Sequence, residues 1–111
     1  MASLDHLANR AADLQLWREQ FNDAIPINRL RVRQREICVG VVLKIRLDPG
    51  RKLAVTVDDG TGKLTAVFTG RSNLPGLELG AGLRLTGTVG DTDGERHMLN
   101  PGWTPVAEPY A

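Results

Sequence analysis

The sequence predicts a mainly β fold, a small five-stranded barrel that follows an N-terminal amphipathic helix. Three stretches carry this prediction: residues 52–69 alternate apolar and polar side chains, residues 35–47 are rich in β-branched residues, and residues 3–23 repeat apolar side chains at helical spacing. Alternation with a period of two is typical of half-buried strands, whereas spacings of three and four are typical of helices. The 111 residues suffice for one domain with one hydrophobic core.

Residues 52–69 are central to the prediction because they read as a β-hairpin. One face of the hairpin is apolar, and its members are Leu53, Val55, Val57, Leu64, Ala66 and Phe68. The turn at residues 58–62 contains residues that accept positive φ angles or close turns with their own side chains. An isolated hairpin is not stable in water, so further strands must cover its apolar face.

Residues 3–23 are expected to form an amphipathic helix that ends before Pro26. Its apolar stripe consists of Leu4, Leu7, Ala11, Leu14, Trp17 and Phe21. Two interpretations stay open. The stripe packs on the rest of its own domain, or it pairs with another chain, because one helix of this length is only marginally stable alone. In the second interpretation Trp17 and Phe21 are interface anchors.

Residues 35–47 are predicted to form a long first strand, which follows an extended connector over residues 26–34. β-branched residues dominate the strand, and Gly40 lies in its interior. A glycine in that position is typical of a bulge or a sharp bend. We therefore expect the strand to bend at Gly40 and to take part in both halves of a small barrel.

The later elements are shorter. Residues 70–80 lack alternation and can hold at most one helical turn, around Leu74 to Leu77. Residues 82–89 alternate again and predict a fourth strand, residues 90–94 predict an exposed loop, and residues 96–100 predict a short fifth strand that Pro101 ends. The tail after Gly102 contains two prolines and is expected to run extended against the surface.

This order of elements is the layout of an OB-fold, a partly open five-stranded Greek-key barrel. The irregular segment falls between the third and fourth strands, where an OB-fold has its helix, whereas an SH3-like barrel has a long loop early in the chain. We expect residues 1–25 to form the helical segment, residues 26–104 the OB barrel and residues 105–111 an extended C-terminal tail.

Several short motifs resemble those of known OB domains. Residues 57–64, VDDGTGKL, are similar to the hairpin of many nucleic-acid-binding OB domains, such as the tRNA anticodon-binding type and the wedge domain of the RecG branch-migration helicase. Residues 74–77, 83–89 and 98–101 resemble small single-domain OB-fold proteins of high-GC Gram-positive bacteria. The resemblance covers about residues 26–104 and implies nucleic-acid binding, although OB domains also bind proteins and sugars.

Positive charge is concentrated near the first strand. The net charge of the chain is only +1, but residues 29–52 contain eight basic and two acidic residues. The basic residues of this stretch are Arg29, Arg31, Arg33, Arg35, Lys44, Arg46, Arg51 and Lys52. Such a stripe is typical of a nucleic-acid contact surface, or of a strand edge that charge protects from aggregation.

The sequence contains no convincing catalytic constellation, and we predict that the protein is not an enzyme. His6 and His97 are isolated, which leaves no ligand set for a metal. Cys38 lies among apolar residues with no histidine near it in the sequence, as expected of a core thiol rather than a nucleophile. Asp58 and Asp59 are explained by the turn. There is no phosphate-binding loop, and no cofactor is expected.

The single cysteine excludes an intramolecular disulfide and fits a reducing compartment. No apolar stretch approaches the ~18 residues that a membrane-spanning helix needs, and residues 1–17 lack the pattern of a secretory signal. We therefore expect a cytoplasmic protein with no membrane partner.

The candidate binding site follows from the predicted fold. The ligand of an OB-fold lies across the second and third strands, between the loops that join strands one to two and four to five. The residues expected at this face and its rim are Lys44, Arg46, Arg51, Lys52, Thr56, Lys63, Thr65, Val67, Thr69, Arg71, Arg96 and Trp103. The cations suit contacts with phosphates, while Trp103 either stacks on a base or covers the barrel end.

Aromatic residues are only 5% of the chain, and none falls on the outer face of strands 52–58 and 63–69. Asp91, Asp93 and Glu95 add negative charge near the same site, which repels phosphates. Without stacking, affinity rests mainly on charge, so the expected partner is single-stranded DNA or RNA, bound weakly, without sequence preference and with strong dependence on salt.

The alternative is a protein-interaction or oligomerisation module with no role in nucleic-acid binding. In this interpretation residues 3–23 form a homo-oligomer or dock on a partner protein, and the basic edge of the first strand receives another strand. Burial of Trp17 against its own barrel would argue against this alternative.

Overall fold

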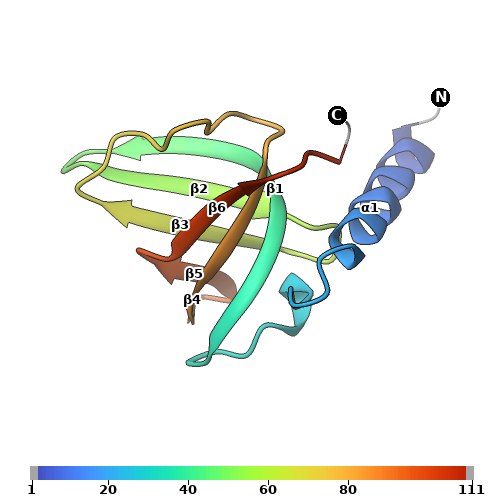
Figure 1. The fold of residues 1–111 in the computed structure, drawn as a ribbon, viewed down its shortest axis with the longest axis horizontal. Coiled ribbons are helices and arrows are strands. Elements are labelled where there is room, and N and C mark those ends of the chain that lie inside the picture. The colour runs from blue at the N-terminus through green and yellow to red at the C-terminus, as the bar shows by residue number, and fades with distance from the viewer. Residues whose placement is uncertain (1–2, 110–111) are drawn as a thin grey trace.

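The computed structural model describes residues 3–109, which form one α-helix, one 3-10 helix and six strands (Figure 1). In chain order the elements are α1 (Ser3–Glu19), η1 (Ile27–Arg29), β1 (Arg35–Asp48), β2 (Lys52–Asp58), β3 (Lys63–Thr69), β4 (Gly82–Thr92), β5 (Glu95–Leu99) and β6 (Gly102–Val106). The expected division into residues 1–25, 26–104 and 105–111 stays a prediction.

Five strands close into a ring in the order β1-β2-β3-β5-β4, and β4 returns to pair with β1. Pairing is antiparallel around the ring except between β3 and β5, which run parallel. Closure pairs strands that are far apart in the sequence and leaves few free edges. The mainly β barrel with an N-terminal helix is therefore confirmed.

Strand β1 joins both halves of the barrel because it bends where the sequence has a glycine. Val41, next to Gly40, pairs both with Asp58 of β2 and with Gly82 of β4. A Cβ atom at Gly40 would lie 2.8 Å from the Cβ of Val57, so only glycine allows this close crossing. The predicted bend is confirmed, but the shift in register lies beyond it, between Val42 and Lys44.

Strand β5 is followed by a bulge, after which the chain continues to pair with β4 as strand β6. Val89 of β4 pairs with Met98, whereas Thr86, three residues earlier, pairs with Gly102, four residues later. The register thus shifts by one residue at Asn100 and Pro101, which is the definition of a bulge. The tail predicted to run along the surface is, over residues 102–106, a strand of the sheet.

The loop expected at residues 90–94 is shorter than predicted. Strand β4 continues to Thr92, so that only Asp93 and Gly94 connect it to β5. Both residues have positive φ angles, 54° and 82°, which suits a two-residue hairpin turn. The sequence did not reveal this because residues 90–92 carry no apolar alternation.

The barrel interior contains the apolar face that the hairpin predicted. The six inward residues of β2 and β3 have at most 2% of their surface exposed. Ile27 of η1 covers one region of this core and Leu74 of the irregular connector another, and both are fully buried. The connector over residues 70–81 holds only turns, in agreement with the prediction of at most one helical turn around Leu74 to Leu77.

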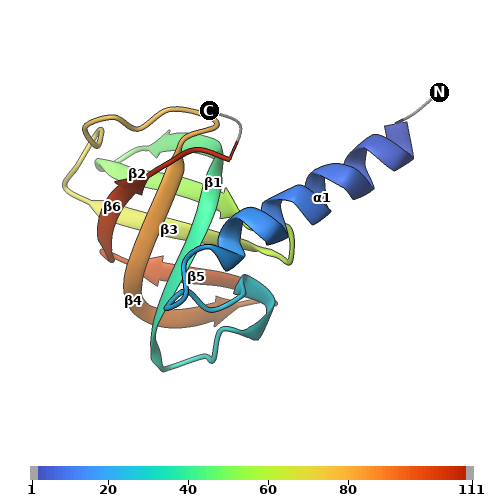
Figure 2. The same ribbon diagram turned by 45° about the vertical axis from the view of Figure 1, so that its right-hand side comes forward.

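Helix α1 lies against the outside of the barrel with its C-terminal half, and its N-terminal half extends away from the barrel (Figure 2). Leu14 and Trp17 are buried against Val39 and Val41 of β1. The indole Nε1 of Trp17 donates a hydrogen bond to the carbonyl oxygen of Ala107 at 2.9 Å. Trp17 is therefore buried within its own chain, as the first interpretation of the stripe expected.

The helix is shorter than predicted, because it ends at Glu19 and turns follow up to Asp23. Phe21 nevertheless meets Trp17 edge to face, with ring centroids 5.4 Å apart. The side chains of residues 3–9, among them Leu4, His6 and Leu7, lie outside the described part of the structure. No helix within residues 3–109 is both long and apolar enough to cross a membrane.

The β2–β3 turn is fixed to both helices by Asp59, whose side chain is fully buried. Its carboxylate accepts hydrogen bonds from the backbone N–H groups of Ile27 and Thr61, each at 2.9 Å, and from the Thr61 hydroxyl at 2.6 Å. The guanidinium of Arg18 on α1 lies 3.8 Å from the same carboxylate. Asp58 accepts from the Gly60 N–H at 2.8 Å, so the turn-forming role predicted for both carboxylates is confirmed.

Candidate functional site

The outer face of the barrel carries one row of four side chains that crosses four strands. Lys44 of β1 pairs with Thr56 of β2, Thr56 with Thr65 of β3, and Thr65 with His97 of β5. Residues paired in this way share a face of the sheet, and neighbouring strands are about 4.8 Å apart, so the row is about 14 Å long. We call these four residues the central row. The hydroxyls of Thr56 and Thr65 bond to each other at 3.1 Å.

The bulge in β1 places Lys44 in this row. Val42 pairs with Val57, which points inward, and Lys44 pairs with the next residue of β2, Thr56, which points outward. Leu43 is the extra residue, and 38% of its surface is exposed. A regular strand would have set Leu43 opposite Thr56 and turned the lysine to the other face.

The central row forms the floor of a broad groove between β1 and the β4–β5 turn. The groove has a volume of about 940 Å³, which is in the range of ligand clefts. Its lining comes from β1, β2, β3 and the β4–β5 hairpin and consists of Leu43, Lys44, Arg46, Ala54, Thr56, Gly62, Lys63, Thr65, Thr92, Gly94, Glu95, Arg96 and His97. We call this the outer groove.

The charges of the outer groove are four basic side chains against one acidic side chain, Glu95. Lys44 and Lys63 are exposed and make no ion pair within the described part of the chain. Arg46 forms a two-bond contact with Asp48, at 2.8 and 3.2 Å. Arg96 donates to the carbonyl oxygen of Asn28 in η1 at 3.3 Å. The two lysines are therefore the cations most available to a ligand.

Six of the twelve residues predicted for the binding site meet in the outer groove. They are Lys44, Arg46, Thr56, Lys63, Thr65 and Arg96. Three others, Lys52, Val67 and Thr69, share the outer face of the hairpin but do not line the groove. Thr69 is instead bonded to the side chain of Asn100, through its backbone N–H at 2.9 Å.

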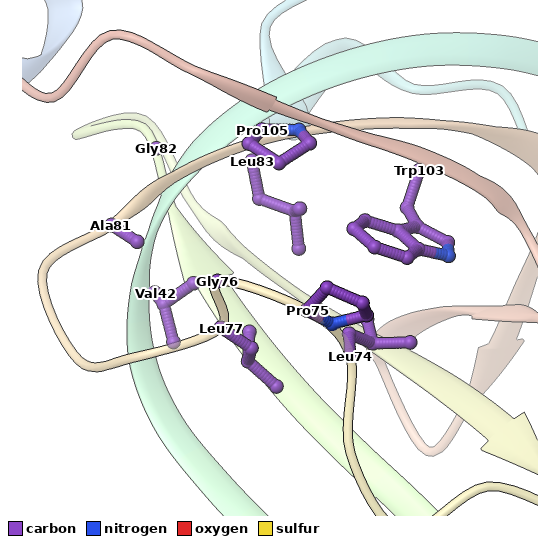
Figure 3. Close-up of a pocket in the computed structure, with 10 residues that line it drawn as sticks. All are labelled: Val42, Leu74, Pro75, Gly76, Leu77, Ala81, Gly82, Leu83, Trp103 and Pro105. Carbon is purple, nitrogen blue, oxygen red and sulfur yellow. The ribbon is translucent and has the colours of Figure 1, made fainter.

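The remaining three predicted residues lie elsewhere. Arg51 is in the β1–β2 turn, and Arg71 is exposed at the start of the connector after β3. Trp103 lines a small apolar pocket with Leu74, Leu77 and other residues, and its ring packs against the barrel core (Figure 3). Of the two roles considered for Trp103, the structure favours covering the barrel end over stacking in the outer groove.

Sequence reasoning missed His97 and Leu43 as groove residues. The sequence singles out His97 only as a potential metal ligand, because its place beside Thr65 depends on the parallel β3–β5 pairing, which no local sequence pattern indicates. Leu43 reads as an ordinary strand residue in the sequence, because the sequence predicts the bulge or bend at Gly40, whereas the register shifts between Val42 and Lys44. Among the described residues, no group of three or more His, Cys, Asp or Glu side chains gathers as a metal site would require.

Cys38 cannot contribute chemistry to the outer groove. It is fully buried in the barrel core. Burial, together with the negative charge of Asp59, raises the pKa of the thiol to about 12. A thiol with that pKa stays protonated near neutral pH and is a poor nucleophile.

No protein-family model matches the sequence, and no curated protein matches it. Solved structures do resemble the fold. One belongs to a replication protein A heterotrimer bound to single-stranded DNA, with a TM-score of 0.55, 22% identity, and coverage of 67% of this chain and 58% of that chain. Another is the HINb domain of p204, with a TM-score of 0.65, 18% identity, and coverage of 79% and 49%. The chain thus spans about half to three fifths of these two chains.

A third similar structure is the OB domain of MM0293 from Methanosarcina mazei. The TM-score is 0.61 at 17% identity, and the match covers 78% of this chain and 84% of that domain. At such low identity the likeness concerns the fold. The closed ring β1-β2-β3-β5-β4, its parallel β3–β5 pair and this likeness identify the domain of this chain as an OB-fold.

Proposed function

We propose that this protein binds nucleic acid in the outer groove, in single-stranded form and without sequence preference, and that it does so without catalysing a reaction. The observation that carries the proposal is the position of Lys44 and Lys63, two exposed cations without ion-pair partners in the described part of the chain, at a groove that crosses the hairpin of an OB-fold. Cations at such a groove neutralise phosphates and release counterions.

The similar structures support the proposal through the nucleic acids with which they were solved. One replication protein A heterotrimer was solved with single-stranded DNA, and the HINa domain of Ifi202 with a 20-base-pair duplex. Structures with a similar fold have thus been solved both with single-stranded DNA and with duplex DNA. Two finer expectations belong to the same proposal: kinship with the small OB-fold proteins of high-GC Gram-positive bacteria and the anticodon-binding or RecG-wedge type, and a location in the cytoplasm.

The experiment is fluorescence anisotropy of a labelled strand of about 20 deoxythymidines, titrated with the full chain at several salt concentrations. We expect binding that weakens steeply with salt. For single strands each neutralised phosphate contributes about 0.7 to the slope of log K against log salt, so Lys44→Ala with Lys63→Ala should reduce the slope by about 1.4.

The matched control removes the same charge away from the outer groove, by Arg10→Ala with Arg71→Ala. Both side chains are exposed, on α1 and on the connector after β3. We expect this double variant to keep the slope of the wild type. Absence of binding at low salt, or an equal effect of the two double variants, would contradict the proposal.

The alternative role of residues 3–23 in a homo-oligomer or a complex with a protein stays a prediction. The solved neighbours include assemblies, such as the Stn1–Ten1 complex of S. pombe. In this chain, however, Trp17 is 6% exposed and bonded to Ala107, so it is not free to anchor a partner without leaving its own barrel.

A further inference from the structure

The imidazole of His97 lies flat on the barrel because the opposite residue on β4 is a glycine. His97 pairs with Gly90, so the two residues share the outer face of the sheet. A Cβ atom at Gly90 would lie 2.4 Å from Nε2, 2.7 Å from Cε1 and 3.1 Å from Cδ2 of the ring. A Cβ position beside the edge of the ring, in line with Nε2, would be much farther from the two ring carbons than from Nε2. Here the ring carbons are only slightly farther away than Nε2, so Gly90 lies beneath the face of the ring.

One face of the ring therefore covers Gly90, and the other is turned to the outer groove that His97 lines. The residue is half-buried, as expected of a ring with one covered face. Beside it in the central row stand Thr65 and Thr56, whose short side chains leave room above the sheet. Of the described ring side chains, His97 is the one that lines this groove.

We infer that His97 is a base-stacking site, on which an unpaired base of a single strand lies. This inference rests on the proposed function and deepens it, because charge alone does not distinguish a single strand from a duplex. A paired base has both faces covered by its neighbours and cannot stack on a side chain, whereas every unpaired base offers a free face. Lys44 lies three strands away from His97 along the central row, about 14 Å at the usual spacing of strands, a span that the sugar-phosphate chain of a few nucleotides covers.

The test compares three labelled probes of equal length at one low salt concentration: a strand of about 20 deoxythymidines, the same backbone with abasic sites throughout, and a duplex. The full chain is expected to bind the thymidine strand about 5- to 160-fold more tightly than the abasic strand, the range that one stacked base gives. His97→Ala should abolish this preference and leave the affinity for the abasic strand unchanged. His97→Phe should retain the preference, which excludes the charge of the imidazole as its source.

A second variant tests the geometry without changing the ring. Gly90→Ala places a methyl group where the imidazole lies, so the ring must leave its position. We expect Gly90→Ala to lose the preference for bases as His97→Ala does. Leu99→Ala on the same strand, whose side chain is 63% exposed and outside the outer groove, is the matched control and should keep the preference. Circular dichroism of each variant verifies the fold.

The outcomes separate this inference from the proposed function. Equal affinity for the thymidine and abasic strands, or an unchanged preference in His97→Ala, would overturn the stacking site and leave phosphate binding intact. Tighter binding of the duplex than of the thymidine strand would also overturn it. No binding of any probe would overturn the proposed function itself, and the stacking site with it.

Discussion

Two acidic side chains, Asp59 and Glu36, fix loops of this barrel through hydrogen bonds that they accept from backbone N–H groups. Asp59 is fully buried within the turn that it organises. Glu36 lies at the start of β1, is 7% exposed, and accepts from the backbone N–H of Arg31 at 3.3 Å and from its guanidinium at 3.1 Å. The side-chain hydrogen bond from Arg31 lowers the pKa of Glu36 below its usual value of 4.5.

Stability should therefore depend on pH through Glu36. A carboxyl whose pKa is lower in the folded than in the unfolded state stabilises the fold above its unfolded pKa, and this contribution is lost as pH falls through the folded pKa. We expect Glu36→Gln to unfold at lower urea concentration than the wild type at pH 7. The difference should shrink below pH 4.5, where the wild-type carboxyl takes up its proton.

The measurement is the urea midpoint of both proteins from pH 7 to about pH 3. The guanidinium partner is 73% exposed, so added salt should reduce the difference at pH 7. A difference that stays constant across this range of pH would assign the effect of Glu36→Gln to packing rather than to charge.

The role of a residue could be predicted from the sequence where that role depends only on residues a few positions away in the chain. Asp58 and Asp59 were recognised as turn residues because an aspartate bonds to backbone groups two or three positions away. His97 was not recognised as a groove residue, since its position depends on Thr65 and Gly90, which are distant in the sequence. No residue near His97 reveals that a glycine lies beneath its ring.

At the scale of elements, we expect a few buried side chains of α1 to hold the helix against strand β1. Leu14 has 1% of its surface exposed and packs with Trp17 on β1, whereas Leu16, two residues on, is 64% exposed. We expect Leu14→Ala to lower the free energy of unfolding by about 3 kcal/mol, the usual cost of a cavity left by a buried leucine. The same substitution at Leu16 should change it by less than about 0.5 kcal/mol.

Urea unfolding followed by circular dichroism measures both values. The comparison controls for helix propensity, because both positions lie in the same helix and undergo the same substitution. Similar losses at the two positions would mean that propensity, rather than the contact with β1, determines the stability of α1.

Strand positions could be predicted from alternation, but their irregularities could not. The bulges at Leu43 and at Asn100 shift the register by one residue each, and neither has the glycine that was expected to mark a bulge. The first bulge places Lys44 in the outer groove, and the second lets Trp103 pair with Leu85 and pack on the core. Because a bulge reverses the faces of all later residues, the outward set of a strand is less predictable than the strand itself.

At the scale of the whole molecule, the helix and the barrel should unfold together. Each carries one tryptophan, Trp17 at the junction of α1 with the barrel and Trp103 in β6. In Trp103→Phe the fluorescence reports the junction, and in Trp17→Phe it reports the barrel. We expect the fluorescence transition in urea to coincide with that of circular dichroism in both variants, as for a two-state domain.

An earlier fluorescence transition in Trp103→Phe alone would show that α1 leaves the barrel before the strands separate. The comparison is made within each variant, so the stability change that each substitution causes does not affect the conclusion.

The bond between Trp17 and Ala107 also has a consequence for synthesis on the ribosome. The segment that contains Trp17 emerges early, while β6 and the carbonyl of Ala107 emerge at least 80 residues later. At typical rates of about 5–20 residues per second, the helix waits several seconds for the surface that it covers. During that interval the connector over residues 26–34 and the open hairpin of β2 and β3 are exposed to the crowded cell, and the arrival of β6 ends that exposure.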